Sequence, residues 1–261
     1  MYLLRDGASG LADYLRQEVF LAQPLAAGSR GQAARRVQEW LSLHGHRLAI
    51  DGLYGAITAE VVAEFQTSAS LPPTGAVDAA TFARLSRPLQ QALSPLSMAS
   101  RSLRATVVRY AQSHLAQRPL EIGGQNRGPW VRAYMDGHDG TEWAWCAGFV
   151  TFILRQACET LGIAMPIEGS VSCDTLAAQA KRAGLFLAEA DARKSGVPEG
   201  SIFLVRRTSS DWTHTGIVLE PRELLFRTVE GNSNDSGDRE GYEVCSNSRG
   251  YAGKDFIVLP S

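Results

Sequence analysis

Three separate segments of the chain hold residue types that together could perform nucleophilic catalysis. Cys146 begins the apolar run 147–154, which is typical of a buried helix, and the unpaired N–H groups and dipole at a helix N-terminus favour the thiolate. His214 begins a segment of strand-forming residues, and Glu230 and Asn232 end the next such segment. Each alone is better explained as a core cysteine, a surface histidine or a polar loop. Together they fit a nucleophile, a base and a group that orients the base.

The strand that ends at Glu230 is expected to pair antiparallel with the strand that begins at His214, which would bring these side chains together. Glu230 and Asn232 are two residues apart and would point to the same face. We expect Glu230 to orient His214, because only a carboxylate also stabilises the imidazolium form, and Asn232 to be a supporting polar group. The tryptophans near the nucleophile and the base, Trp145 and Trp212, are expected to contact substrate.

Hydrophobic periodicity predicts helices first and mostly strands towards the end of the chain. The expected helices cover 35–43, 58–67, a short segment capped by Asp78, 103–115, 145–161 and 174–182. The expected strands cover 201–206, 214–219, 224–229 and 256–259. Helices followed by an antiparallel run of strands predict an α+β fold.

A stretch rich in proline and serine, residues 86–100, is expected to be a linker. It divides the chain into a small helical part, residues 1–94 with a core over 25–87, and a larger α+β part, residues 95–261. A further helix is expected over about 9–22.

Composition excludes several classes of protein. The 261 residues are 44% apolar and 20% charged, and 26 basic against 27 acidic side chains give a net charge of -1. Disordered chains and chains drawn electrostatically to nucleic acid are therefore excluded. No apolar run is long enough to span a membrane, and the first residues do not resemble a secretory signal. The four cysteines have no CxxC spacing, so we expect Cys158, Cys173 and Cys245 to be structural.

The larger part resembles the CHAP family (cysteine, histidine-dependent amidohydrolase/peptidase). The matching segments are Trp145-Cys146-Ala147, His214-x-Gly216-Ile217-Val218 and Glu230-Gly231-Asn232. The turn Pro198-Glu199-Gly200-Ser201 also fits, although the family more often has Pro-Gly-Asp there. The resemblance implies a papain-like domain in which Cys146 is the nucleophile, His214 the base, Glu230 the orienting carboxylate and Asn232 an auxiliary group.

Residues 25–85 resemble a second family, the three-helix peptidoglycan-binding module. The matches are Val37-Gln38, Asp51-Gly52-x-x-Gly55, Thr58, Phe65-Gln66, Leu71, Thr74-Gly75, Asp78 and Thr81. The glycines permit turn conformations that other residues avoid. Within the loop, Asp51, Tyr54 and Gly55 are candidate contacts for the wall polymer, with a purely structural role as the alternative.

No cofactor and no metal site is expected. The acidic cluster 136–142 lies in a region where some CHAP domains bind calcium. Its carboxylates are few and lack the alternating spacing of a calcium loop, which favours a solvated loop.

The two resemblances indicate the same polymer, so the sequence predicts a peptidoglycan hydrolase that cleaves an amide bond, either as an amidase or as an endopeptidase. A cysteine acyltransferase and a non-catalytic wall-binding protein are the alternatives. Peptidoglycan is the expected partner, with no nucleic acid and no membrane span. Without a signal, the protein is expected to reach the wall as a phage endolysin through a holin, or as an effector of a secretion system with a matching immunity protein.

Overall fold

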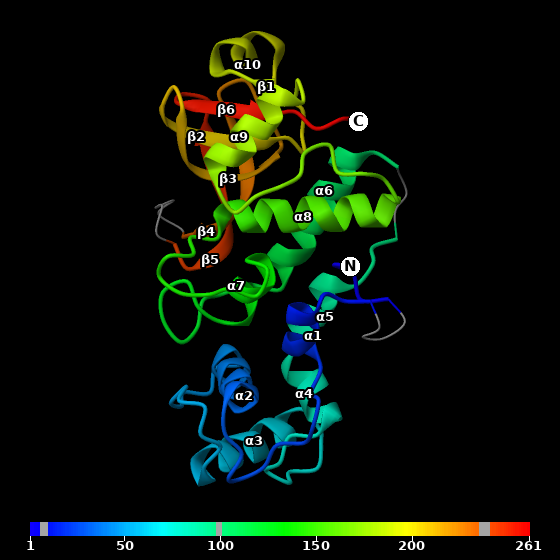
Figure 1. The fold of residues 1–261 in the computed structure, drawn as a ribbon, viewed down its shortest axis with the longest axis vertical. Coiled ribbons are helices and arrows are strands. Elements are labelled where there is room, and N and C mark those ends of the chain that lie inside the picture. The colour runs from blue at the N-terminus through cyan, green and yellow to red at the C-terminus, as the bar shows by residue number, and fades with distance from the viewer. Residues whose placement is uncertain (6–9, 98–100, 235–240) are drawn as a thin grey trace.

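The structure, a computed structural model, describes residues 1–5, 10–97, 101–234 and 241–261. Within these residues, helices fill the first part of the chain, and an antiparallel sheet with flanking helices fills the rest. The α+β class predicted from the sequence is therefore confirmed. Figure 1 shows a smaller helical body at one end and a larger body with the sheet at the other.

The smaller body is built on the helices predicted from the sequence, with shifts of a few residues at their ends. They are α2 (Gln32–Leu43), α3 (Ala56–Ser68) and α4 (Ala79–Leu85). The expected cap of α4 is present, because the carboxylate of Asp78 accepts the N–H of Thr81 at 2.7 Å. Val37 and Leu41, one helical turn apart on α2, are fully buried in the core.

Two buried glutamines hold the glycine turns of this body. Gln38 accepts the N–H of Gly52 at 2.8 Å and donates to Asp51 at 2.8 Å. Gln66 accepts the N–H of Gly75 at 3.0 Å. Because each amide is almost wholly buried, losing its partner would leave an unsatisfied polar group inside the protein. This explains physically why a glutamine follows an apolar residue in both helices.

The segment expected to be a linker contains a helix. This helix, α5 (Arg87–Leu93), has Pro88 in its first turn, where the missing N–H does no harm. Residues 98–100 of the expected linker lie outside the described residues. The helix expected over 9–22 is present as the shorter α1 (Asp13–Val19). Both helices lie between the two bodies (Figure 1).

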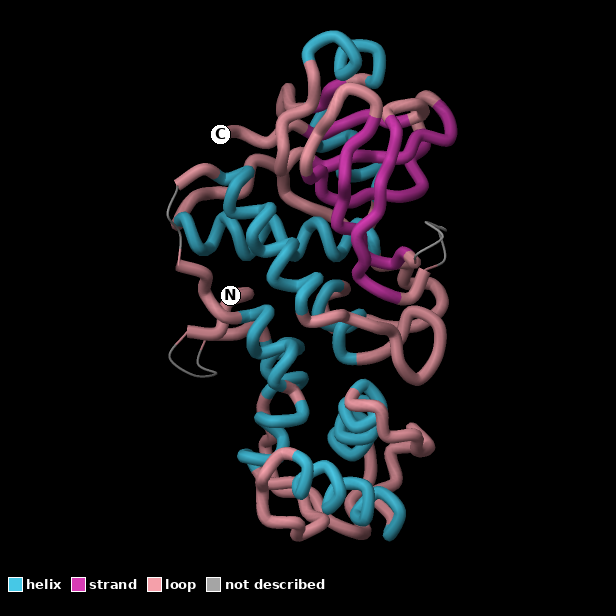
Figure 2. The backbone as a smooth tube through the Cα atoms, turned by 180° about the vertical axis from the view of Figure 1, so that it is seen from behind, coloured by secondary structure: helices cyan, strands magenta, loops and turns pink. Residues whose placement is uncertain are grey.

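A long buried helix runs through the larger body. This helix, α8 (Cys146–Leu161), contacts the neighbouring helix α6 (Leu103–Ala116) and two central strands of the sheet. Three shorter helices complete the body: α7 (Pro129–Tyr134), α9 (Cys173–Arg182) and α10 (Glu189–Ser195). In Figure 2, α6 and α8 cross beside the sheet. Almost every residue in the first three turns of α8 is buried, so the helix presents its N-terminus to the sheet from inside the core.

The sheet has the strand order β1-β6-β2-β3-β4-β5, with antiparallel pairing throughout. Its strands are β1 (Phe186–Leu187), β2 (Ile202–Thr208), β3 (Asp211–Leu219), β4 (Leu225–Ser233), β5 (Glu243–Gly250) and β6 (Lys254–Ile257). Four of them correspond to predicted strands, and β3 and β4 pair antiparallel as expected. The sequence analysis did not predict β5, whose polar residues 246–249 lack the usual strand composition. Figure 2 shows the strands at one end of the molecule.

The N-terminal segment and α5 pack directly against the larger body. The backbone N–H of Tyr2 donates to Glu159 on α8 at 2.7 Å, and Gln156 of α8 donates to the carbonyl of Ala92 at 3.1 Å. One continuous hydrophobic core includes buried residues of both bodies. The domain boundary at residue 94 stays a prediction. The chain just before it, in α5, is held on α8 of the larger body by the hydrogen bond to Ala92.

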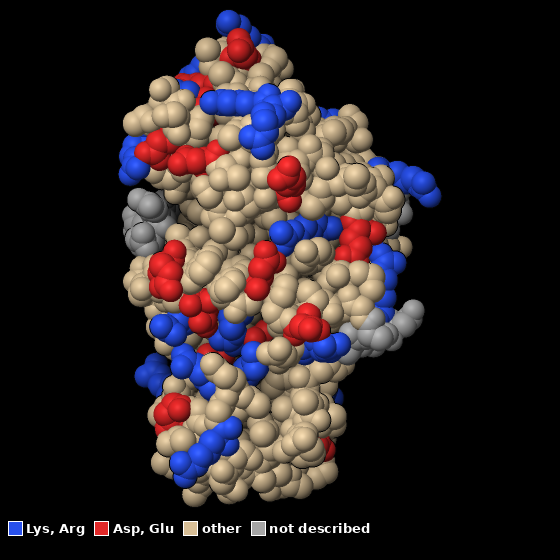
Figure 3. Space-filling model, in the orientation of Figure 1, with Lys and Arg blue, Asp and Glu red and all other residues tan. Residues whose placement is uncertain are grey.

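A buried ion cluster also connects the bodies. Arg132 of α7 donates to Glu18 of α1 at 2.8 and 3.0 Å, and to Glu39 of α2. Both glutamates are almost without exposed surface, and each has a second arginine partner, Arg36 and Arg35 respectively. Figure 3 shows charged side chains of both signs gathered where the two bodies meet. The cluster therefore fixes α7 against the helical body.

No helix among the described residues has the length and apolar character needed to cross a membrane.

Removing the central cation of this cluster should destabilise the protein. We expect Arg132→Ala to lower the free energy of unfolding by about 3 kcal/mol, because it leaves two buried carboxylates short of a partner. Urea unfolding followed by tryptophan fluorescence measures the change. Arg193→Ala is the matched control, since its ion pair with Glu189 is at the surface and should contribute less than about 1 kcal/mol. Equal midpoints for the two variants would contradict a structural role for the cluster.

Candidate active site

The predicted nucleophile is the first residue of a buried helix. Cys146 begins α8 directly after Trp145 and is 5% exposed. The first N–H groups of a helix have no acceptor within the helix, so this sulfur lies where negative charge is favoured. Gly148, in the same turn, packs so closely that a Cβ would meet the carbonyl oxygen of Tyr134 at 2.6 Å. The turn that holds Cys146 is therefore tightly seated on the end of α7.

The predicted base lies on β3, close to the sulfur. His214 is 4% exposed, and its Nε2 lies 2.8 Å from Oε2 of Glu230 on β4. The other ring nitrogen, Nδ1, has no hydrogen-bond partner among the described residues. Cys146 is the neighbouring group that interacts with the ring electrostatically, so Nδ1 is available to exchange a proton with the sulfur. The structure thus brings Cys146, His214 and Glu230 together, as the spacing of the motifs led us to expect.

Two glycines permit the close approach of these elements. A Cβ on Gly216 would lie 2.8 Å from Cγ of Glu230, and a Cβ on Gly231 would lie 2.7 Å from Cβ of Phe149 on α8. A side chain at Gly216 would push β3 away from β4, and one at Gly231 would push β4 away from α8. The glycines in His214-x-Gly216 and Glu230-Gly231 are therefore needed for space beside the site.

Three groups besides His214 hold the carboxylate of Glu230 in place. It has no exposed surface, and Arg249 of β5 binds both carboxylate oxygens, with a distance of 2.7 Å from Nε to Oε1. The hydroxyls of Thr228 and Ser233 also donate to it, at 2.5 and 3.2 Å. A buried carboxylate needs such partners to remain charged. Arg249 belongs to the strand that the sequence analysis missed, and only its alternation with the neighbouring residues of β5 could have indicated it.

These contacts set the charge of each group. Burial favours the neutral form of Glu230, but hydrogen bonds from Arg249 and His214 outweigh it and hold the carboxyl pKa well below its usual range. Burial likewise opposes charge on His214, yet the interactions with Cys146 and Glu230 raise the pKa of His214 to about 9. The thiol pKa of Cys146 is held well below its ordinary value, first by a hydrogen bond with Cys173, against burial, and then by His214. The favoured state at neutral pH is therefore a thiolate beside an imidazolium.

Asn232 is placed differently from the expectation. Glu230 pairs with Cys245 and Ser233 with Glu243, so two residues of β4 between them lie opposite one residue of β5, and the strand has a bulge there. Asn232 has a left-handed backbone with φ of 52° within this bulge. The simple alternation that would put Glu230 and Asn232 on one face is interrupted, and Ser233 contacts the carboxylate. Asn232 is buried beside the site.

Both tryptophans that were expected to contact substrate are buried. The ring of Trp145 stacks on Tyr134, and its Nε1 donates to Glu121 at 2.8 Å. Trp212 donates from Nε1 to Asp255 at 2.9 Å and is 6% exposed. This burial argues against the substrate contacts, because neither indole has a face open to solvent. The two side chains support the elements on which the nucleophile and the base lie.

The candidate wall contacts of the helical body also differ in exposure. Tyr54 is 1% exposed and its hydroxyl donates to the carbonyl of Gly75, so it belongs to the core and not to a binding surface. Asp51 and Gly55 are exposed. Of the three, only these two are accessible to a polymer.

The acidic segment before Cys146 is engaged with arginines. Asp136 accepts from Arg155 at 2.7 Å, and Asp139 accepts from Arg132 at 2.9 Å. Within the described residues, no group of three or more acidic, histidine or cysteine side chains is arranged to hold a metal ion. The two carboxylates therefore form ion pairs within the larger body.

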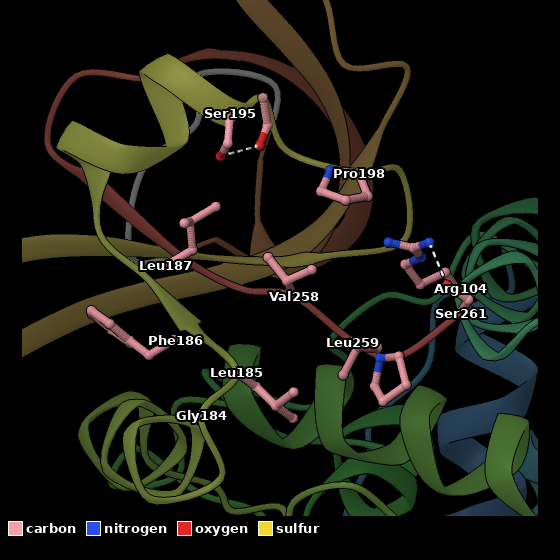
Figure 4. A pocket seen from close by; sticks show the side chains of 12 residues that line it. Arg104, Gly184, Leu185, Phe186, Leu187, Ser195, Pro198, Val258, Leu259 and Ser261 are labelled. Carbon is pink, nitrogen blue, oxygen red and sulfur yellow. Dashed lines mark hydrogen bonds between the residues drawn. The ribbon is translucent and has the colours of Figure 1, made fainter.

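A pocket of about 630 Å³ lies elsewhere, between α10, the start of α6 and the C-terminal segment (Figure 4). Leu185, Leu187 and Val258 line it, and Arg104 donates to Ser261 across one side at 3.1 Å. None of its lining residues belongs to the group formed by the cysteine, histidine and glutamate. The pocket is separate from the candidate active site.

The contacts of Glu230 predict a change in both rate and pH dependence. Glu230→Gln keeps an acceptor for His214 but loses the negative charge. If the site performs the peptidoglycan hydrolysis predicted from the sequence, digestion of purified sacculi should slow at least about a hundredfold in this variant. The wild-type rate should fall as the pH rises through about 9, where His214 loses its proton. In Glu230→Gln that fall should occur at lower pH, because the carboxylate no longer stabilises the imidazolium.

Asn232→Ala is the comparison variant in the same strand. Its rate should fall by only about tenfold, equivalent to about 1.4 kcal/mol in the barrier, with the alkaline limb unchanged. Single-turnover rates between pH 5 and 10, with the fold checked by circular dichroism, give both quantities. A larger loss in Asn232→Ala than in Glu230→Gln would reverse the two roles.

Comparison with known families gives a separate result for the first part of the chain. Residues 30–85 match the model of a family described as a putative peptidoglycan binding domain. The matched residues contain α2, α3 and α4 with both glutamine-held turns. No match to the CHAP family was found. No curated protein matches the chain. Residues 30–85 therefore form a peptidoglycan-binding domain, which supports association of the protein with the cell wall.

Proposed function

We propose that the protein is a cysteine amidohydrolase or peptidase that cleaves an amide bond of peptidoglycan. The observation that carries the proposal is the buried arrangement of Cys146, His214 and Glu230 at the N-terminus of α8. The peptidoglycan-binding domain at residues 30–85 supports the choice of polymer. Peptides attached to a wall polymer supply the amide bonds that such a thiolate attacks.

The charges of the site support the following reaction. The Cys146 thiolate attacks the amide carbonyl carbon, and the backbone N–H of Cys146 stabilises the resulting oxyanion from the end of α8. The imidazolium of His214 transfers its proton to the leaving amine, which departs and leaves an acyl-enzyme. Neutral His214 then takes a proton from water, the hydroxide oxygen attacks the acyl carbon, and the thiolate is released. Glu230 keeps the imidazole oriented throughout.

The bond that is cut distinguishes an amidase from an endopeptidase. Digestion of purified sacculi and mass spectrometry of the soluble products answers the question. An amidase releases whole stem peptides and leaves glycan strands without peptide, whereas an endopeptidase releases fragments that still hold part of the stem. Intact sacculi after prolonged digestion would contradict the proposal.

Loss of the nucleophile should separate catalysis from binding. We expect Cys146→Ala and Cys146→Ser to reduce the hydrolysis of sacculi at least about a thousandfold, because a serine hydroxyl cannot replace a thiolate here. Both variants should still sediment with sacculi, since the binding domain is unchanged. Cys158→Ala, on the same helix but away from His214, should retain wild-type hydrolysis. Substantial hydrolysis by either Cys146 variant would exclude this mechanism.

The acceptor of the acyl group decides between hydrolysis and acyl transfer. Products are compared with and without a primary amine such as glycine ethyl ester at millimolar concentration. We expect free carboxylates in both reactions, because His214 activates water. Transfer of most acyl groups to the amine would assign the protein to the acyltransferases.

The reaction derived above uses no metal ion. We therefore expect EDTA at millimolar concentration to change the rate of sacculus hydrolysis by less than about twofold, because Asp136 and Asp139 are bound by arginines. A rate that falls on chelation and returns with calcium would show that the acidic segment before Cys146 binds the ion.

A further inference from the structure

A second cysteine lies beside the proposed nucleophile. The Sγ atoms of Cys146 and Cys173 are 3.9 Å apart, within hydrogen-bond distance for sulfur. Cys173 is the first residue of α9, as Cys146 is of α8, and both are almost entirely buried. The sequence analysis expected Cys173 to be structural, because the four cysteines have no CxxC spacing.

Specific hydrogen bonds hold the first turn of α9 next to the site. The carboxylate of Asp174 accepts the backbone N–H of Trp212 on β3 at 2.7 Å, two residues before His214. The loop before α9 is held on α8 by two hydrogen bonds between Thr151 and Ser170, at 2.7 and 3.0 Å. The helix start is thus bound to both elements that supply the reactive groups.

The chemistry of the pair decides which sulfur donates. A thiolate can only accept a hydrogen bond, and two thiolates at this distance would repel each other. His214 supplies the positive charge beside Cys146, so Cys146 ionises and Cys173 remains the thiol. The Cys146 residue is 5% exposed, so water gives the thiolate little solvation and protein donors must replace it.

We propose that Cys173 is a positioning residue of the active site, whose S–H donates a hydrogen bond to the Cys146 thiolate and holds it in its reactive state. The inference rests on the proposed function, since it concerns the same nucleophile. The titratable groups that interact with Cys146 are His214 from β3 and Cys173 from α9, with Glu230 and Arg249 behind the histidine. The hydrogen bond with Cys173 is the largest of the influences that lower the thiol pKa of Cys146.

The test measures the ionisation of Cys146 without any substrate. The full chain is treated with iodoacetamide between pH 3 and 10, and mass spectrometry follows alkylation of the Cys146 peptide. Cys173→Ala and Cys173→Val both remove the S–H donor, the first with a smaller side chain and the second with a larger one. Cys173→Ser keeps a hydrogen-bond donor on a side chain about as small as that of alanine. Cys158→Ala is the matched control, because Cys158 is buried on α8 and its pKa is raised to about 11 by burial alone.

We expect the alkylation midpoint to rise by about one pH unit in Cys173→Ala and Cys173→Val, which slows alkylation about tenfold below the midpoint. Cys173→Ser should stay close to the wild type, and Cys158→Ala should equal it. Thermal unfolding of each variant identifies a purely structural effect, which would lower stability without moving the midpoint. If the alanine variant does not fold, the valine and serine variants still separate donor from non-donor.

Two results would overturn the inference. Midpoints of Cys173→Ala and Cys173→Val equal to the wild type would show that the thiol does not act on Cys146. A serine variant that shifts as far as alanine would show that packing, and not donation, matters. A wild-type midpoint near the ordinary cysteine value of about 8.5 would instead remove the thiolate–imidazolium pair, and with it the proposed function.

Discussion

The charge on Glu230 is the feature around which the larger body is organised. A carboxylate without exposed surface is stable only when other groups replace its lost hydration. Arg249 lies on β5, at the edge of the sheet, where it supplies the opposite charge and donates hydrogen bonds to both oxygens of this carboxylate. The carboxylate that holds His214 is therefore already neutralised in part by Arg249. The histidine can become cationic inside the protein because the charges of Glu230 and Cys146 are balanced by those of His214 and the half-buried Arg249.

This balance requires close approach between elements that are far apart in the sequence. The start of α8 must reach β3 and β4, and Gly216 and Gly231 remove the side chains that would prevent it. The bulge in β4 turns Ser233 towards the carboxylate. The start of α9 joins the same place through Asp174. The elements α8, β3, β4 and α9 therefore meet at one sulfur. Each is held there by a local feature (a glycine, a bulge or a hydrogen bond) that a single substitution would disrupt.

The sequence was sufficient for the features that have a local signal. The helices of the binding domain, the cap at Asp78 and the buried helix after Cys146 follow from periodicity and capping chemistry, and the pairing of β3 with β4 follows from their proximity along the chain. The roles of Arg249 and Cys173 depend on contacts between distant segments, so no local pattern revealed them. Tyr54 and Trp145 show the opposite error: both lie within functional motifs, but an aromatic ring there supports the backbone from the core.

The join between the two bodies has a consequence for how the protein would work on an insoluble polymer. Flexible linkers let a bound enzyme sample many bonds around its attachment point, with an effective concentration set by linker length. Here Arg132 of α7 binds Glu39 within the binding domain, and Tyr2 and α5, which lie on either side of that domain in the chain, are held on α8. A wall segment held by residues 30–85 would then meet Cys146 at one offset and one angle. Under the proposed function, a glycan strand could be bound and cut by the same molecule only where the spacing of the wall matches that offset. The mesh of the polymer would then be part of the specificity.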